Sequence, residues 1–459
     1  MRKLTLLICS TLVFLLFLSV PKLETHAKEF RSIIRVPLHY ETIQEAVNNA
    51  SNGDTILVSQ GTYYENVVVN KSVSIIGENR NITIVDGNGL ESAFYVHAEN
   101  VVISNFTLRN GYSGVWLFNS KNCTVSGNNA NNNAYGIKLY HSYNSIISNN
   151  MVNNNKWFGI TLHYSGNTTL RNNNLTENNF NFGVDGDTLF DFINDIDTSN
   201  TVDNKPSRYM INQHNLTIDS STFPEIGYLA FINSTNINVK NLNLSNNFQG
   251  ILFAYSPNCT INGINTTNNW YGIYLKNSPN CKIEENNASN NFDYAIALRL
   301  SGNCTVSKNN VNNNDWGSIS LAFSPNSMIT ENNVSNSYYG IHLVDTTNCV
   351  ATGNNVNTGN GYSIVIYRAD NNVIYHNNFV SYFIYAYAGS TNIWDNGIEG
   401  NYWKNYNGID ANQDGIGDAP YSLDENNKDN YPLMGTISDF TVSFQQETYH
   451  IAIISNSTI

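Results

Sequence analysis

The sequence predicts an all-β fold, a right-handed parallel β-helix with coils of about 22–23 residues. Two strings repeat in step along the chain. One is Asn-X-X-apolar followed by an Asn pair, seen from Asn122 to Asn348. The other is Gly-Ile-X-Leu or a close variant, which begins at Gly114, Gly136, Gly159, Gly250, Gly272, Ala295, Ser318, Gly340 and Ser363. Two strings in register indicate a solenoid, in which each coil packs only on its neighbours.

The strands of this solenoid are short runs in which apolar and polar residues alternate. Runs with a period of two are typical of β-strands, and in coils this short they can pair only with equivalent strands about 4.8 Å away in the next coil. The parity predicts that Ile273 and Leu275 point inward. By the same parity Cys259, Cys281 and Cys304 face the core, where Ser or Thr replaces Cys in other coils. We interpret them as small core residues; a thiol metal site or a disulfide is the alternative, although in-register parallel neighbours have poor disulfide geometry.

The two ends of the chain differ from the repeat. Arg2 and Lys3 precede an apolar run, so residues 1–27 read as a signal peptide, with a membrane anchor as the alternative. No later segment is apolar enough to span a membrane, which predicts an exported protein, secreted or on the cell surface, without a membrane span after cleavage. The β-helix is expected over 28–434, and an amphipathic helix at 40–50 is expected to cap its N-terminal end.

The coil pattern fails once, over about 183–225. A turn is expected at 203–206, and the segment is either an excursion from the solenoid or a set of irregular coils. If the protein is an enzyme, aspartates here are the best acid, base or nucleophile candidates. These catalytic candidates are Asp185, Asp187, Asp195 and Asp197.

A calcium loop is predicted in the C-terminal cap, residues 400–432. Oxygen donors alternate and Gly415 stands at the sixth position, as at the start of an EF-hand loop, although Tyr421 replaces the usual glutamate. A solvated turn is the alternative. The proposed ligands of a structural Ca²⁺ are Asp410, Asn412, Asp414 and Asp418. Residues 435–459 read as a strand tail or the stub of a further β domain.

Composition limits the partners. Charged residues make up 13% of the chain and the net charge is −13, which argues against nucleic acid.

Aromatic side chains with polar edges suit sugar rings, and outward positions of the Gly-Ile-X-Leu strand carry several of them. The predicted polysaccharide-binding residues are Trp116, Phe118, Lys138, Tyr140, His163, Tyr274 and Lys276. Asn-X-Ser/Thr triplets such as that at Asn105 recur, so the protein is also a candidate glycoprotein.

The chain resembles the NosD-like branch of the CASH family of carbohydrate-binding proteins and sugar hydrolases, a type common among exported archaeal proteins. The resemblance covers about 37–434. It rests on the coils and on three motifs, which are Ile43-Gln-Glu-Ala-Val with Gly61-Thr-Tyr-Tyr-Glu-Asn, the segment 195–206, and Gly400-Asn-Tyr-Trp with Asp429-Asn-Tyr-Pro. It implies a pectin-lyase-like β-helix, export and contact with carbohydrate, and it supplies no catalytic residues.

Four functions are compatible with the sequence. We favour a non-catalytic, exported binder of polysaccharide or surface glycan. A polysaccharide lyase or hydrolase acting through the 183–225 carboxylates is the first alternative, but the Asn-Thr-Asp and Arg-Ile-Lys strings of polygalacturonases and the Asp-Pro-His of alginate epimerases are absent. The second alternative is a NosD-like periplasmic factor for copper-site maturation. Copper sites need clustered His, Cys or Met ligands, and the nearest approach to such a cluster is the possible pair of His141 and His163. A surface scaffold or adhesin is the third.

Overall fold

The computed structural model describes residues 32–89, 91–381, 383–386, 389–437, 440–443 and 452–455. The expected signal peptide lies outside these residues. The predicted parallel β-helix is confirmed: Val115 pairs with Ile137, which pairs with Ile160, and equivalent positions are 22 or 23 residues apart. No helix in the described ranges is long and apolar enough to cross a membrane.

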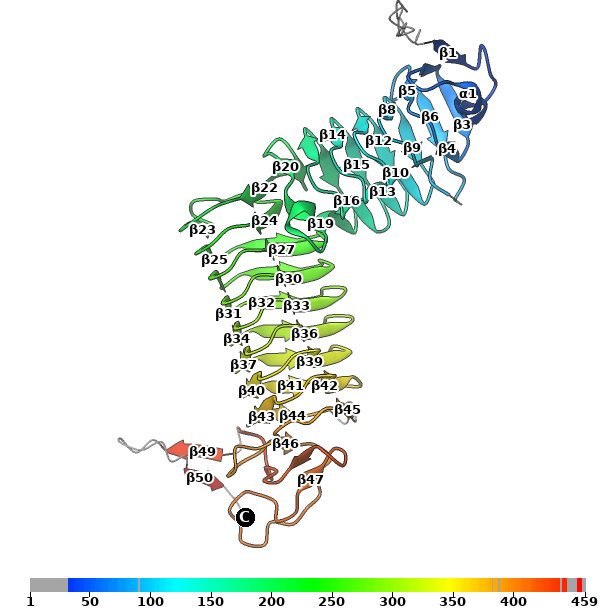
Figure 1. Ribbon diagram of the computed structural model, residues 1–459. Coiled ribbons are helices and arrows are strands. Elements are labelled where there is room, and N and C mark those ends of the chain that lie inside the picture. The colour runs from blue at the N-terminus through cyan, green and yellow to red at the C-terminus, as the bar shows by residue number, and fades with distance from the viewer. Residues whose placement is uncertain are drawn as a thin grey trace, which may run out of the picture.

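Two straight stretches of coils make up the molecule, and they meet at an angle near β19 and β27 (Figure 1). The N-terminal half contains three sheets. One consists of β1 (Ile33–Val36), β2 (Thr55–Val58), β5 (Ser74–Gly77), β8 (Val102–Ser104), β11 (Thr124–Ser126), β14 (Ile146–Ser148), β17 (Thr169–Arg171) and β20 (Asp195–Ile196). The second begins with β3 (Gly61–Tyr64), β6 (Thr83–Asp86), β9 (Thr107–Arg109), β12 (Asn129–Asn131), β15 (Met151–Asn153), β18 (Asn174–Thr176) and β21 (Thr201–Val202). The third, the N-terminal long-strand sheet, consists of β4 (Val67–Val69), β7 (Phe94–Val96), β10 (Ser113–Phe118), β13 (Tyr135–Tyr140), β16 (Phe158–His163) and β19 (Phe180–Asp185).

The C-terminal half repeats this plan. Its long-strand sheet consists of β22 (Lys205–Ile211), β24 (Tyr228–Ile232), β27 (Gln249–Ala254), β30 (Tyr271–Lys276), β33 (Tyr294–Arg299), β36 (Gly317–Ala322), β39 (Tyr339–Val344), β42 (Tyr362–Tyr367) and β45 (Phe383–Ala386). A second sheet consists of β23 (Thr217–Asp219), β25 (Asn238–Lys240), β28 (Thr260–Asn262), β31 (Lys282–Glu284), β34 (Thr305–Ser307), β37 (Met328–Thr330), β40 (Val350–Thr352) and β43 (Val373–Tyr375). The third consists of β26 (Asn243–Ser245), β29 (Asn265–Thr267), β32 (Asn287–Ser289), β35 (Asn310–Asn312), β38 (Asn333–Ser335), β41 (Asn355–Asn357), β44 (Asn378–Phe379) and β46 (Tyr402–Trp403).

The abundance of asparagine follows from the bends between strands. Asn122, Asn144 and Asn167 occupy equivalent turns with φ of 55°, 59° and 53°, a left-handed conformation that asparagine tolerates better than most residues. Other asparagines are buried and hydrogen-bond neighbouring coils. The Asn150 side chain accepts from the Asn128 backbone N–H at 3.0 Å and donates to the Val125 carbonyl at 2.9 Å. These amides satisfy backbone groups that the bends would otherwise leave unpaired.

The core contains the inward apolar side chains of every coil. As predicted, Ile273 and Leu275 are fully buried. The core position of the cysteines is also confirmed, because Cys259, Cys281 and Cys304 are free thiols with 1% exposure. These sulfurs are enclosed in the core and are therefore not accessible to a ligand from solvent.

Both ends of the solenoid are covered. The expected capping helix is α1 (Ile43–Asn49), which buries Ile43, Ala46 and Val47 against the first coil. The C-terminal cap contains the antiparallel pair β47 (Tyr421–Ser422) and β48 (Lys428–Asp429). Beyond it, β49 (Phe440–Ser443) pairs with β50 (Ala452–Ser455).

The segment 183–225 forms the bend. It contains the end of β19, the short helix α2 (Leu189–Phe192) and strands β20 to β23. A hairpin at Asp203 and Asn204, both with positive φ, makes β22 antiparallel to β21. The short-strand sheet that holds β21 therefore continues into the long-strand sheet of the C-terminal half. The N-terminal long-strand sheet ends at β19, whose Phe182 carbonyl accepts from the Phe248 backbone N–H at 3.0 Å.

Candidate glycan-binding face

Aromatic side chains cover the outer side of the N-terminal long-strand sheet. Phe118 and Tyr140 stack with ring centroids 5.7 Å apart and an interplanar angle of 4°. The Lys138 ammonium lies 4.8 Å from the ring centroid of Trp116 and 4.6 Å from that of Tyr135. These side chains come from in-register positions of β10 and β13, so the period that builds the coil also aligns the rings. Trp116, Phe118, Lys138, Tyr140 and His163 are all partly exposed, as the sequence predicted.

Tyr274 and Lys276 were also expected on the outer surface, and there the structure differs. Their side chains leave the coil outward, but the 183–225 segment covers them, so Tyr274 is 6% exposed and the Lys276 side chain 1%. The Lys276 ammonium lies 2.7 Å from Asp187 Oδ1. Both residues belong to the packing of the bend and are not available to a ligand.

The bend encloses a hollow of about 390 Å³, which we call the elbow cleft. The N-terminal half supplies one wall and the C-terminal half supplies the other. Phe158 and Phe248 meet edge to face at 5.4 Å, which ties the two walls together. The cleft is lined by Tyr135, Lys138, Tyr140, Phe158, His163, Phe248, Trp270, Tyr271 and Asp293.

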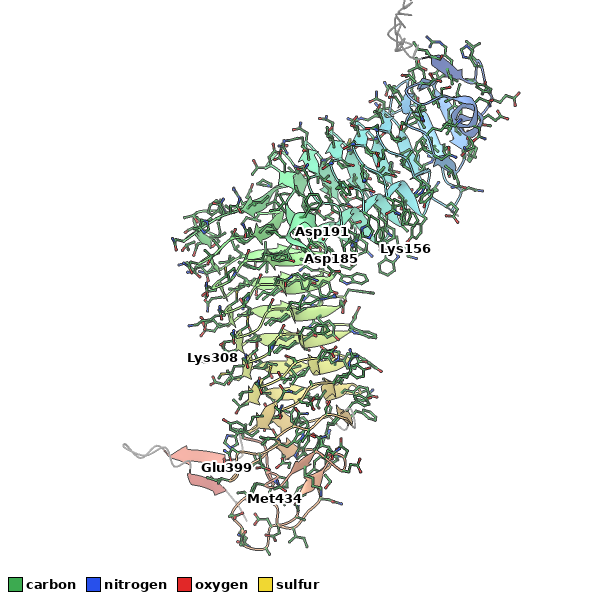
Figure 2. All side chains as sticks on the ribbon, in the orientation of Figure 1. Lys156, Asp185, Asp191, Lys308, Glu399 and Met434 are labelled. Carbon is green, nitrogen blue, oxygen red and sulfur yellow. The ribbon has the colours of Figure 1, made fainter. Side chains whose placement is uncertain are left out.

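Burial controls the ionisation of the groups beneath this cleft. Desolvation lowers the pKa of His163 to about 4, with a contribution from Lys138, so this imidazole is neutral at neutral pH. Its Nδ1 lies 4.0 Å from Asp185 Oδ2. Desolvation raises the pKa of Asp185, and the hydrogen bond from Lys276 lowers the pKa of Asp187. Figure 2 places Asp185 and Asp191 at the bend.

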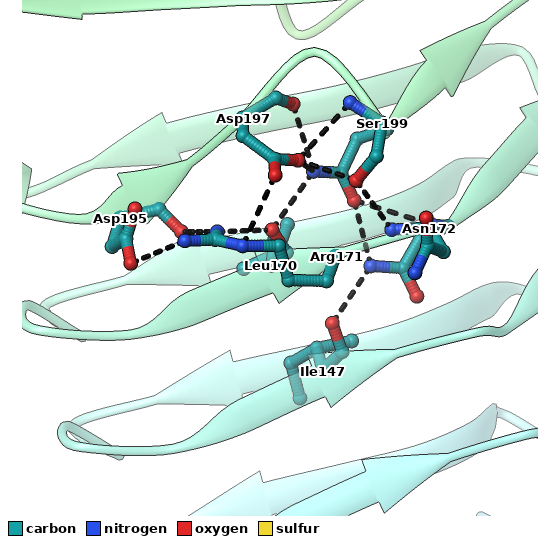
Figure 3. A network of polar contacts seen from close by, with 9 residues as sticks. Ile147, Leu170, Arg171, Asn172, Asp195, Asp197 and Ser199 are labelled. Carbon is teal, nitrogen blue, oxygen red and sulfur yellow. Dashed lines mark hydrogen bonds and ion pairs between the residues drawn. The ribbon is translucent and has the colours of Figure 1, made fainter.

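The other two catalytic candidates lie elsewhere. Asp195 and Asp197 both pair with Arg171, at 2.5 Å and 3.1 Å, on the short-strand sheet that contains β17 and β20 (Figure 3). The Arg171 guanidinium also donates to the Leu170 and Asp195 carbonyls. The four aspartates therefore form two separate pairs, Asp185 with Asp187 and Asp195 with Asp197. They do not assemble one two-carboxylate site.

A line of exposed rings continues from the cleft along the C-terminal half. Centroids lie 4.6 Å apart for Trp270 and Phe292, and 5.6 Å apart for the stacked Trp316 and Tyr338. Tyr362 follows Tyr338 at 5.8 Å. Trp316 is 50% exposed and Tyr338 is 46% exposed. We call the row of rings that stand at, or one or two residues before, the start of successive long strands the aromatic track: Trp270, Phe292, Trp316, Tyr338, Tyr362 and Phe383.

Sequence reasoning missed the aromatic track although a signal was present. Five of the rings precede the Gly-Ile-X-Leu string of their coil by one to three residues and Phe383 begins β45, whereas the predicted binding residues lie on the strand that carries the string. The track ends in a second hollow of about 270 Å³, lined by tyrosines and His342. His342 Nδ1 lies 2.5 Å from the Tyr294 hydroxyl, and burial lowers the pKa of His342 to about 4.

The predicted calcium residues share one exposed loop. Asp410 Oδ2 accepts from the Gly415 backbone N–H at 2.9 Å, and Asp418 Oδ2 accepts from Ala411 at 2.9 Å. Asn412 donates to Asp414 at 2.9 Å. The four side chains therefore satisfy the backbone of the turn and one another. Calcium binding at this loop stays a prediction.

These features define a parallel β-helix protein with an aromatic, angled outer face. The family model for NosD, described as a periplasmic copper-binding protein, matches residues 47–188 and 193–408. The chain therefore belongs to the NosD family. No curated protein matches the chain.

Several solved structures match the chain at low sequence identity. The chain is similar to the Dettilon tailspike protein (14% identity, TM-score 0.29, covering 77% of this chain and 68% of that one). It is similar to the A-module of the mannuronan C-5 epimerase AlgE6 of Azotobacter vinelandii (14% identity, TM-score 0.31, covering 76% of this chain and 91% of that one). It is also similar to the catalytic domain of a GH87 alpha-1,3-glucanase (14% identity, TM-score 0.30, covering 70% of this chain and 68% of that one).

The residues that the structure describes do not fit a copper centre. Copper sites are built from clustered histidine, cysteine or methionine ligands. Across the described ranges, no three His, Cys, Asp or Glu side chains are grouped to hold a metal ion. The thiols of Cys259 and Cys281 face the core, and His163 and His342 lie apart in different hollows.

Proposed function

We propose that this protein binds a linear polysaccharide along its aromatic face, without cleaving it. The observation that carries the proposal is the aromatic track, in which each of six successive coils contributes one ring near the start of its long strand. Exposed aromatic rings next to polar groups stack against the apolar C–H faces of sugars and leave the hydroxyls free for hydrogen bonds.

The spacing of the coils supports an extended ligand. Coils repeat about every 4.8 Å along the solenoid, which is close to the advance per unit of an extended glycan chain. A chain lying parallel to the solenoid axis would thus meet a ring at almost every sugar. Each ring stands at or just before the start of a long strand and contacts at least one other ring, which limits the side-chain entropy that binding would remove.

The elbow cleft supports a defined anchoring point on this path. It joins the aromatic surfaces of the two halves at an angle, and it presents the polar groups of Lys138, His163 and Asp293 between rings. A sugar in the cleft would be enclosed on two sides, whereas a sugar on the track would contact one ring. We place the most strongly bound unit in the cleft.

A binding role is favoured over catalysis because of the carboxylates. Hydrolysis of glycosides generally requires two carboxyl groups on opposite sides of one bond. Among the aspartates of the bend, Asp195 and Asp197 share the single cation of Arg171 on another face, and Asp187 is paired with Lys276. We also propose an extracytoplasmic location, in line with the periplasmic description of the NosD family.

Affinity measurements on single-ring variants test the proposal. Binding of soluble neutral oligosaccharides is measured by calorimetry for the intact protein, for Trp316→Ala and for Tyr64→Ala. Tyr64 is 71% exposed on β3, away from the aromatic face. Loss of one stacking ring should cost about 1 kcal/mol, roughly fivefold in affinity. Equal affinities for both variants, or release of shortened sugars from any polymer, would refute a non-catalytic binder that uses this face.

A further inference from the structure

The aromatic track carries an unusual local charge between Trp270 and Trp316. A hollow of about 250 Å³ lies there, lined by these two rings with Phe292, Asp293 and Asp315. It shares Phe292 and Asp315 with a second hollow of about 410 Å³, which Glu177 also lines. We call the two hollows together the acidic groove. Three carboxyl groups thus stand beside a row of aromatic rings.

The lining of this groove is acidic, although Asp293 also lines the elbow cleft together with Lys138. Within the described part of the chain, no Lys, Arg or His lines either hollow. Asp315 and Glu177 have neither a hydrogen bond nor an ion pair from their carboxylates to any described residue. Asp293 accepts a hydrogen bond from the Trp270 indole N–H at 3.1 Å, and the Tyr271 side chain also hydrogen-bonds to it. Burial, largest among the causes, raises the pKa of Asp293, as is typical of a carboxylate that lacks a nearby cation.

Two other acids at the long-strand sheet of the C-terminal half are paired with cations. The Asp187 carboxylate has Lys276, and Asp345 has Arg368 at 2.6 Å. The acidic groove therefore differs from its surroundings in charge and not in shape alone. Carboxylates that flank the faces of tryptophan and phenylalanine form an environment that stabilises an organic cation, both by direct attraction and by cation–π contact.

We propose that the acidic groove binds the protonated amine of an amino-sugar unit, so that the polysaccharide recognised by this protein is a cationic glycan. This proposal rests on the proposed function and names the substrate class of the same face. A sugar stacked on Trp270 or Trp316 would place an equatorial amine toward Asp293 or Asp315.

The backbone makes this placement a fixed property of the coils. Asp293 donates its backbone N–H to the Trp270 carbonyl, and the Gly317 N–H next to Trp316 donates to the Asp293 carbonyl. Asp293 is thus held between the two tryptophans by strand pairing. Asp315 belongs to the following coil, one residue before Trp316, so successive sugars could each find a carboxylate.

The proposal also predicts which glycans are excluded. A polyuronate would place its own carboxylates beside Asp293, Asp315 and Glu177, and like charges at short range repel. A neutral glycan would still stack on the rings but would leave the three carboxylates unpaired. The order of affinity at one chain length is therefore amine, then neutral sugar, then uronate.

Matched oligosaccharides test the inference on the full exported chain. Hexamers of β-1,4-linked glucosamine, N-acetylglucosamine and glucose, and a hexamer of a uronic acid, are titrated calorimetrically at about pH 6, where the amine is largely protonated. The glucosamine hexamer should bind at least about tenfold more tightly than the glucose hexamer, and this preference should shrink as salt is added.

Two double variants assign the preference to the groove. Asp293→Asn/Asp315→Asn should abolish the preference for the amine, because it lowers the affinity for the glucosamine hexamer far more than the affinity for the glucose hexamer. Glu99→Gln/Glu331→Gln removes the same number of charges from exposed sites elsewhere and should keep the preference. Equal affinity of the glucosamine and glucose hexamers, tighter binding of the uronate, or equal losses in both double variants would overturn the inference. If no hexamer binds at all, the proposed function itself fails.

Discussion

The ammonium nitrogen of Lys276 lies 2.7 Å from Oδ1 of Asp187, and this contact joins the two halves of the solenoid. Lys276 ends β30 in the C-terminal half, whereas Asp187 follows β19 in the N-terminal half. The two residues are 89 positions apart in sequence. They meet because the solenoid bends between them. The geometry of the elbow cleft, whose walls come from both halves, relies on such contacts.

Removal of Asp187 tests how strongly the bend is held. Asp187→Ala would leave the Lys276 ammonium, 1% exposed, without its partner, although the Asp187 side chain itself is 58% exposed. We expect a loss of about 1–3 kcal/mol in the free energy of unfolding, measured by urea denaturation. The control Glu331→Ala, from the exposed pair with Lys308, should change it by less than about 0.5 kcal/mol. Equal effects would mean that the buried pair does not hold the bend.

The burial of the cysteines predicts their chemistry. Burial raises the pKa of the Cys123 thiol to about 11, and the residue is 1% exposed. Because the thiolate is the reactive species, iodoacetamide at about pH 8 should leave Cys123 unlabelled in the native protein and label it after denaturation. Peptide mass spectrometry reports the outcome. Rapid labelling of native protein would place the thiol outside the core.

The C-terminal cap should respond to pH through Asp429. Burial raises its pKa to about 6, even though it accepts hydrogen bonds from Trp403 and Asn401. A carboxyl whose pKa is higher in the folded state binds more protons folded than unfolded, so its effect on stability becomes less favourable as pH rises from about 4 to 6. Unfolding free energies of the parent and Asp429→Asn should therefore differ in slope over this range. Parallel pH profiles would contradict the assignment.

The loop at 410–418 should respond to calcium if the prediction from its spacing is right. Addition of Ca²⁺ should raise the melting temperature and EGTA should lower it, since a ligand that binds only the folded state stabilises it by mass action. Asp414→Asn should reduce this response, whereas Asp219→Asn, on β23 at the opposite end of the C-terminal half, should not. A melting temperature independent of Ca²⁺ would leave the loop as an ordinary hydrogen-bonded turn.

The coil period and the alternation within each strand predict much of the architecture. They predict only part of the candidate binding face. The period alone fixes coil length, the inward position of Ile273 and the outward direction of Tyr274, because parity within a strand is local. That Tyr274 is covered could not be read from the period. Its burial depends on the hairpin at Asp203 and Asn204, which changes the sheet that carries the long strands and folds one half against the other. Contacts across such a bend have no local signature.

Affinity as a function of oligosaccharide length tests the central claim most directly. If a glycan lies along the aromatic track, calorimetric affinity for the preferred sugar should rise steadily as the chain grows from two units to six, because each unit reaches another ring. The Trp316→Ala variant should lose this gain for the longer chains and retain the affinity of the dimer, which the elbow cleft holds. Affinity that does not change with length, or a length dependence unaffected by Trp316→Ala, would contradict the account.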